Sequence, residues 1–300
     1  MQLSLISLIP LLLATASSVL AAPIPMVGPG SDDTSNNLLQ DRADGLYQVN
    51  ITAPGSIKLY SNDPAYTATT ARADLNNIMA WAGDSGNLSP SQKTETLAAL
   101  FDVAHRYYPE LPTRAVCRVL MADIRAESDF STNNVSPGRM DSGDSWGLMQ
   151  VSQDGSKELT LFQNHARVSN LPDWSTGRTM NVYALTKRDL LRPWVNIHVA
   201  TWIQANLGKT GSLDPYDWTR YQNNGNRGTG GLPRTLRTGF GSWVAGPHPD
   251  GYGSYLQRGD GASAPYLRAI MRSVNYLYGK DLGVSWLERW TLSSNLADYR

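Results

Sequence analysis

The sequence predicts a mainly α-helical domain with long loops, preceded by a small N-terminal arm that contains a β-hairpin. Apolar residues recur with the period of amphipathic helices after residue 73, and no strong strand-like run separates the helical segments. Of the 300 residues, 41% are apolar and 17% are charged, a balance typical of globular chains. A chain of this length can bury a large core without disulfides, and this one contains a single cysteine.

The arm covers residues 22–72, which are rich in Pro, Gly, Ser, Asp and Asn. Two alternating stretches within it, 46–52 and 56–60, face each other across residues 53–55. This pattern predicts a small hairpin, because turn-forming residues separate two runs with the period of a strand. We assign no chemistry to the arm, and the helical domain then occupies residues 73–300.

Three helices are expected early in this domain. The first covers residues 74–81, and the second begins at Ser89, an N-cap residue followed by Pro90, and runs to about Tyr107. The third begins at Thr113 and carries an apolar stripe. The stripe consists of Val116, Cys117, Leu120, Met121 and Ile124. Since the cysteine lies within the stripe, we expect a buried, unreactive thiol.

Two further helices are expected in the second half of the chain. Pro193 lies in the first turn of one, which ends at Gly208, and the other runs from Ser263 to Gly279. The longest glycine-rich loop, residues 222–261, lies between them.

Charge and targeting signals limit the classes of function. The chain has 26 Lys and Arg against 26 Asp and Glu, so we expect no nucleic-acid partner. Residues 1–21 resemble a secretory signal rather than a membrane anchor, because the apolar core at 3–13 is short and residues 19–21 have the spacing of a cleavage site. We therefore expect a secreted, extracellular monomer without a membrane anchor. Candidate N-glycan acceptors are Asn50, Asn87 and Asn134.

No cofactor or metal is expected from the sequence. The four histidines show neither a His-x-x-x-His motif nor a carboxylate at metal-binding spacing. They are His105, His165, His198 and His248. No phosphate-binding loop or Gly-x-Ser-x-Gly motif is present.

A glutamate ends the apolar stripe of the third helix. Glu127 lies seven residues after Leu120 and eleven after Val116, and both separations are close to whole helical turns. A carboxyl group on a buried face favours its neutral form and can act as a general acid. The alternative is a frayed last turn that directs Glu127 to water.

The residues around Glu127 resemble a known family. The run Ala-Glu-Ser-Asp-Phe at 126–130 is followed by a polar loop and then by Gly-Leu-Met-Gln at 147–150. This combination resembles the soluble lytic transglycosylases and goose-type lysozymes, whose signature is a helix ending in Glu-Ser, a variable loop and Gly-Leu-Met-Gln. The resemblance implies a lysozyme-like helical domain in which Glu127 is the catalytic acid.

Three later segments resemble the same family in the same order. Residues 192–203 resemble its helix with a Pro-x-x-Asn-Ile pattern, residues 216–225 resemble its Ala-Tyr-Asn-Ala-Gly segment, and residues 264–274 resemble its closing tyrosine-containing helix. The resemblance covers about residues 95–280 and does not include the arm.

A second carboxylate would decide the reaction type. Hydrolysis with inversion needs a general base roughly 6.5–9.5 Å from the acid. Asp141 lies six residues before Gly147, where goose-type lysozymes carry an Asp, so the resemblance makes Asp141 the expected base. Asp144 is the alternative, and both residues also fit ordinary turn chemistry. The second goose-type Asp is replaced by Ser152, with Asp154 only a distant substitute.

A set of candidate substrate-binding residues follows, most of them from the resemblance and Trp146 because sugar rings stack on indole faces. They are Ser128, Trp146, Met149, Gln150, Tyr221, Asn223 and Tyr266. Trp146 is the candidate for stacking on a sugar ring, whereas residues such as Met149 also fit a packing role. An extra Gln222 separates Tyr221 from Asn223, so Tyr221 and Tyr266 are both candidates for the hydroxyl that fixes Glu127.

The sequence therefore predicts a secreted muramidase that binds a polysaccharide. It would hydrolyse the β-1,4 bond between N-acetylmuramic acid and N-acetylglucosamine in peptidoglycan, with Glu127 as acid and Asp141 as base. Three alternatives stay open: a lytic transglycosylase that leaves 1,6-anhydro ends, a related enzyme acting on chitin, chitosan or β-mannan, and a glycan-binding protein without turnover.

Overall fold

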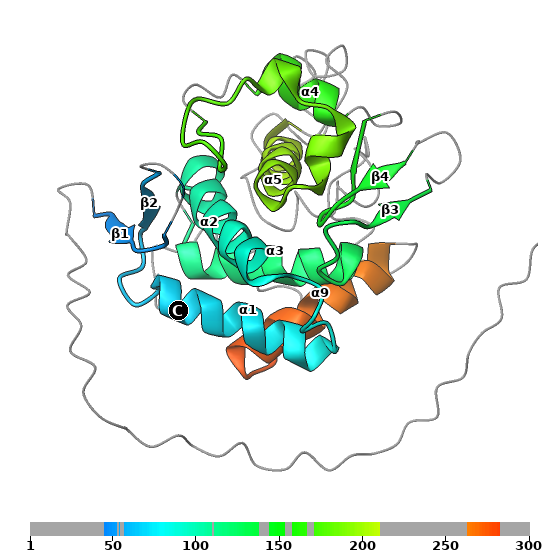
Figure 1. The fold of residues 1–300 in the computed structure, drawn as a ribbon. Helices are drawn as coiled ribbons and strands as arrows, with labels where there is room; N and C mark the ends of the chain where they lie inside the picture. The colour runs from blue at the N-terminus through cyan, green and yellow to red at the C-terminus, as the bar shows by residue number, and fades with distance from the viewer. Residues whose placement is uncertain are drawn as a thin grey trace, which may run out of the picture. The chain divides into compact units, whose positions relative to one another are not determined.

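Six α-helices and two small antiparallel sheets make up the described part of the chain (Figure 1). The computed structural model describes residues 45–52, 54, 57–109, 111–137, 144–153, 158–166, 171–210 and 263–282, without the side chains of 165, 206–210 and 263–267. All of them belong to one unit, Leu38–Arg300. The predicted mainly α-helical class is confirmed. Among these residues, no helix combines the length and apolar character that a membrane span requires.

All five predicted helices are present. They are α1 Ala68–Ala82, α2 Pro90–Tyr107, α3 Thr113–Ser128, α5 Pro193–Thr210 and α9 Ser263–Tyr278. Helix α1 begins earlier than expected because Thr67 and Thr70 form a capping box that starts the helix ahead of its apolar stripe. Helix α4, Glu158–His165, was not predicted.

The predicted hairpin is also present. Strand β1, Tyr47–Val49, pairs antiparallel with β2, Leu59–Ser61. Val49 and Leu59 face each other in the pairing register, and both are buried in the hydrophobic core. Strand β2 contacts α2, so the hairpin packs against the helical domain.

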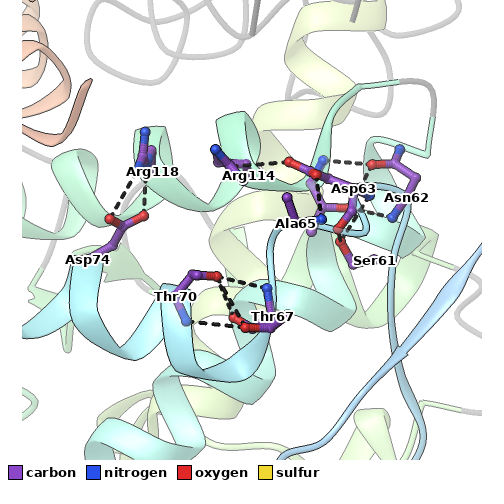
Figure 2. Close-up of polar contacts among 10 residues, drawn as sticks. Ser61, Asn62, Asp63, Ala65, Thr67, Thr70, Asp74, Arg114 and Arg118 are labelled. Carbon is purple, nitrogen blue, oxygen red and sulfur yellow. Dashed lines mark hydrogen bonds and ion pairs between the residues drawn. The ribbon is translucent and has the colours of Figure 1, made fainter. Parts of the chain in front are cut away.

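The segment after β2 is hydrogen-bonded to the start of α3 (Figure 2). Asn62 accepts a hydrogen bond from the backbone N–H of Thr113 at 2.8 Å, and its Nδ2 donates to the carbonyl of Leu111 at 2.8 Å. Asp63 lies 3.1 Å from the guanidinium of Arg114. The residue before α3 is a proline with no capping side chain, so Asn62 satisfies an otherwise unpaired N–H of the first turn.

Helix α3 lies at the centre of the core. It contacts α1, α2 and α9, while α2 packs against α5. Val116, Cys117 and Leu120 are fully buried, as the stripe predicts. Burial raises the pKa of the Cys117 thiol well above its usual value, which fits an unreactive cysteine. Arg118 binds both carboxylate oxygens of Asp74 on α1, at 2.7 and 3.0 Å (Figure 2).

A second sheet, which was not predicted, follows α3. Its antiparallel strands are β3 Val135–Ser136, β4 Ser145–Trp146 and β5 Val151–Ser152. Trp146 in the middle strand pairs with Val135 on one side and Val151 on the other. Two short 3₁₀ helices, η1 Val182–Ala184 and η2 Lys187–Leu191, lead into α5.

Candidate active site

Glu127 lies in the last turn of α3 and is half-buried. The helix continues through Ser128, so its end is not frayed at the glutamate. Asp129 and Phe130 then take left-handed conformations, with φ of 48° and 61°, and these end the helix. Phe130 is fully buried, which fixes the chain directly after the helix end.

A hydrogen bond joins this helix end to the Gly-Leu-Met-Gln turn. The buried hydroxyl of Ser128 lies 2.8 Å from the carbonyl oxygen of Leu148 and 3.2 Å from that of Ile124 in its own helix. The two motifs on which the resemblance rests therefore lie in direct contact. The hydroxyl expected to bind substrate is bonded within the protein.

The turn itself depends on its glycine. Gly147 has a φ of +75°, and a Cβ at this position would lie 2.1 Å from the carbonyl oxygen of Leu190. The N–H of Gly147 donates to the carbonyl of Asn134 at 2.8 Å, and Gln150 Nε2 donates back to the carbonyl of Gly147 at 2.8 Å. Gln150 is half-buried and also has a positive φ of 49°.

Asn196 on α5 fixes the turn from the other side. Its Oδ1 accepts from the backbone N–H of Met149 at 2.7 Å, and its Nδ2 donates to the carbonyls of Trp146 at 2.7 Å and Leu190 at 2.9 Å. Asn196 is fully buried, and its bonds to Met149 and Leu190 satisfy buried backbone groups, whereas the bond to Trp146 is part-buried. We did not single out Asn196 from the sequence, although it is the asparagine of the Pro-x-x-Asn-Ile pattern.

Two contacts fix the start of α5. Glu95 on α2 accepts from the backbone N–H of Trp194 at 3.1 Å, which satisfies a free donor of the first turn. Burial raises the pKa of Glu95, although the bond from Trp194 acts to lower it. Arg192 binds Asp173 at 2.8 Å. Neither contact was visible in the sequence, because the partners lie far apart in the chain.

The other predicted substrate-binding residues lie in different environments. The side chain of Met149 is fully buried in the core, so this residue packs and presents no surface to a ligand. Trp146 is half-buried, and the exposed Lys187 on η2 lies with its Nζ 5.6 Å from the centre of the indole ring. Asp144, the alternative base, is exposed.

Several predicted site residues lie outside the described part of the chain. They are Asp141, Asp154, Tyr221 and Asn223. Tyr266 is on α9, but its side chain is not among those described.

A buried carboxylate that sequence reasoning missed lies beyond the turn. Glu158, the first residue of α4, accepts a hydrogen bond from the backbone N–H of Ser152. Both residues are buried. The resemblance would place an aspartate at position 152. The chain has a serine there, and its backbone N–H donates to the Glu158 carboxylate. Within the described ranges, no three His, Cys, Asp or Glu side chains gather closely enough to hold a metal ion.

No protein-family model and no curated protein sequence matches the chain.

Proposed function

We propose that this protein is a glycosidase with a lysozyme-like domain that cleaves the β-1,4 bond following N-acetylmuramic acid in peptidoglycan. The observation that carries the proposal is the hydrogen bond between Ser128 and Leu148, whose residues lie 20 positions apart in the chain. It brings the Glu-Ser helix end and the Gly-Leu-Met-Gln turn together, as the resemblance requires. Asn196 adds the third motif to the same contact.

In this proposal Glu127 is the general acid. A general acid must be held at a fixed place relative to the glycosidic oxygen, and rigid secondary structure supplies that better than a loop. Glu127 meets this condition because the helix stays regular past it and the next residue is bonded to the turn. Glu127 would protonate the bridging oxygen as the bond from that oxygen to the anomeric carbon breaks.

The remaining step depends on the base. With Asp141 as the base, a water molecule attacks the anomeric carbon from the opposite face and gives up its proton to the carboxylate. The product then has a free reducing end with inverted configuration. The proposed role of Asp141 rests on its six-residue offset from Gly147.

One observation favours a second candidate, anhydro-forming cleavage. Position 152 carries a buried serine whose N–H is bonded to Glu158, instead of the second aspartate of goose-type lysozymes. Without a second carboxylate as base, Glu127 protonates the leaving oxygen, and the resulting Glu127 carboxylate takes the proton of the C6 hydroxyl as that hydroxyl attacks the same carbon. The product is then a 1,6-anhydro sugar, lighter than the hydrolysis product by one water.

The test is mass spectrometry of soluble products from purified peptidoglycan and, separately, from chitin. Wild-type protein should release muropeptides, and Glu127→Gln should release at least about a hundredfold less, since general acids typically contribute that much. Asp129→Asn, which neutralises an exposed carboxylate two residues away, is the matched control and should remain active.

Each outcome has a definite meaning. If Glu127→Gln is as active as the wild type, Glu127 is not the general acid. If the wild type releases no soluble product, the proposed glycosidase activity is wrong. Release from chitin alone would change the substrate. Products with free reducing ends favour Asp141 as the base, and products with 1,6-anhydro ends favour anhydro-forming cleavage.

A further inference from the structure

We infer that Lys187 selects for glycans that carry carboxylates, by binding the anionic group of a sugar placed against Trp146. This inference rests on the proposed function, because it names the substrate class of the same site. Its starting observation is that Lys187 Nζ lies 5.6 Å from the centre of the Trp146 ring, within the range of a cation–π contact. Lys187 is exposed and Trp146 is half-buried.

A short chain of contacts joins Trp146 to the candidate acid. Trp146 comes directly before Gly147 in the turn, and two residues of extended chain span at most about 7 Å from it to Leu148. Leu148 in turn accepts from Ser128, the neighbour of Glu127. The path from Trp146 to Glu127 through these residues is short enough for a few sugar units of a polysaccharide to span.

One buried side chain bonds the two backbone segments that carry Lys187 and Trp146. Asn196 Nδ2 donates to the carbonyl of Trp146 in β4 and to that of Leu190 in η2. Lys187 is the first residue of η2. The two elements that carry the cation and the ring are thus bonded to the same amide group, so the contact belongs to the folded framework of the turn.

The chemistry of the pair favours an anionic sugar. Sugar rings stack on indole through their C–H faces, and an ammonium at the same ring adds a local positive charge. The chain has zero formal net charge, so attraction for an anion must come from local groups. A muramic acid residue carries a lactyl carboxylate when its peptide is removed, whereas chitin and β-mannan are neutral and chitosan is cationic. The pair therefore favours muramic-acid glycans with a free lactyl carboxylate over the other three polymers.

The test compares two forms of one ligand. Peptidoglycan strands stripped of their peptides carry free lactyl carboxylates, and treatment with methylamine and a carbodiimide turns these into neutral amides. Binding is measured by calorimetry in the Glu127→Gln background, which prevents cleavage. The parent should bind the charged strands more tightly, and Lys187→Gln should weaken that binding about fivefold at low salt. The preference for charged over amidated strands should fall with it.

Two variants control for charge and for folding. Arg188→Gln removes an equal charge from the next residue and should leave the preference within about twofold of the parent. Lys187→Arg keeps a cation over the ring and should retain the preference. Melting temperatures establish that each variant is folded.

Three results would overturn the inference. They are an unchanged preference in Lys187→Gln, an equal fall in Arg188→Gln, and an absence of binding to both kinds of strand. Failure of the proposed function is seen separately, as the lack of soluble glycan fragments from the wild-type protein.

Discussion

Gly147 lies so close to Asn196 that a Cβ on the glycine would come within 2.5 Å of the asparagine Nδ2. The same Cβ would lie 2.1 Å from the carbonyl oxygen of Leu190, a backbone atom that cannot rotate away. The close approach exists because Asn196 bonds the turn and η2 simultaneously. Any side chain at position 147 must therefore separate two segments that one buried amide holds together.

Gly147→Ala should lower the free energy of unfolding by about 3 kcal/mol or more, because a backbone clash adds to the strain of a left-handed residue. Urea denaturation followed by circular dichroism measures this. The matched control is Gly83→Ala, at a φ of +88° with nothing within 4 Å of the added Cβ. It should lose only about 1–2 kcal/mol. Equal losses in the two variants would show that the close approach to Leu190 contributes nothing.

Asn196→Ala should be at least as damaging. It leaves the N–H of Met149 and two carbonyls without their partner, and an unpaired buried group costs about 1–3 kcal/mol. We expect a loss of at least about 3 kcal/mol in urea denaturation. Asn77→Ala, at an exposed position of α1, is the control and should change stability by less than about 0.5 kcal/mol. A comparable stability in both variants would contradict the role assigned to Asn196.

The parts of the fold that follow local periodicity were predictable. Helix α3 was found because Val116 and Leu120 repeat at helical spacing, and the hairpin because Val49 and Leu59 stand in alternating runs. Helix boundaries were less accurate where a cap, and not an apolar residue, begins the helix, as Thr67 does for α1.

The contacts that hold the candidate site were not predictable from local pattern. Strands β3 to β5 have two residues each, too few for alternation to be visible. The bond between Asn196 and Met149 joins residues 47 positions apart, and that between Glu95 and Trp194 joins residues 99 apart. Only the resemblance brought the motifs around Glu127 together, and it gave no reason for their contact. The structure supplies that reason as hydrogen bonds.

The cap that Asn62 supplies to α3 gives a third prediction. Its Oδ1 accepts from both the backbone N–H and the hydroxyl of Thr113, at 2.8 and 2.9 Å. Asn62→Ala should therefore lower the free energy of unfolding by about 1–2 kcal/mol, as the loss of a helix cap usually does. Asn62→Asp loses the Nδ2 bond to Leu111 but keeps the acceptor at the positive end of the helix, so it should lose less than Asn62→Ala. The prediction is wrong if the two variants unfold at the same urea concentration.

The last prediction concerns a buried histidine on α5. His198 is 1% exposed, with Nδ1 3.2 Å from the hydroxyl of Tyr107 and Nε2 3.3 Å from a carboxylate oxygen of Asp102. Burial is the main cause that lowers the pKa of His198 from 6.5 to about 3. The positive charge of Arg106 also lowers this pKa, whereas the negative charge of Asp102 raises it. The folded protein therefore keeps this imidazole neutral at a pH where the unfolded chain protonates it.

Stability should consequently fall as the pH drops below 6.5, since the unfolded state then binds a proton that the folded state binds only near pH 3. For this one group the slope approaches about 1.4 kcal/mol per pH unit between these values. Urea denaturation at several pH values from 7 to 4.5 measures it. His198→Gln has no imidazole to protonate, so its stability should fall less steeply over this range, whatever its absolute stability. The control Asn77→Ala should keep the wild-type dependence of stability on pH. If His198→Gln shows a dependence as steep as that of the wild type, other groups cause the acid sensitivity.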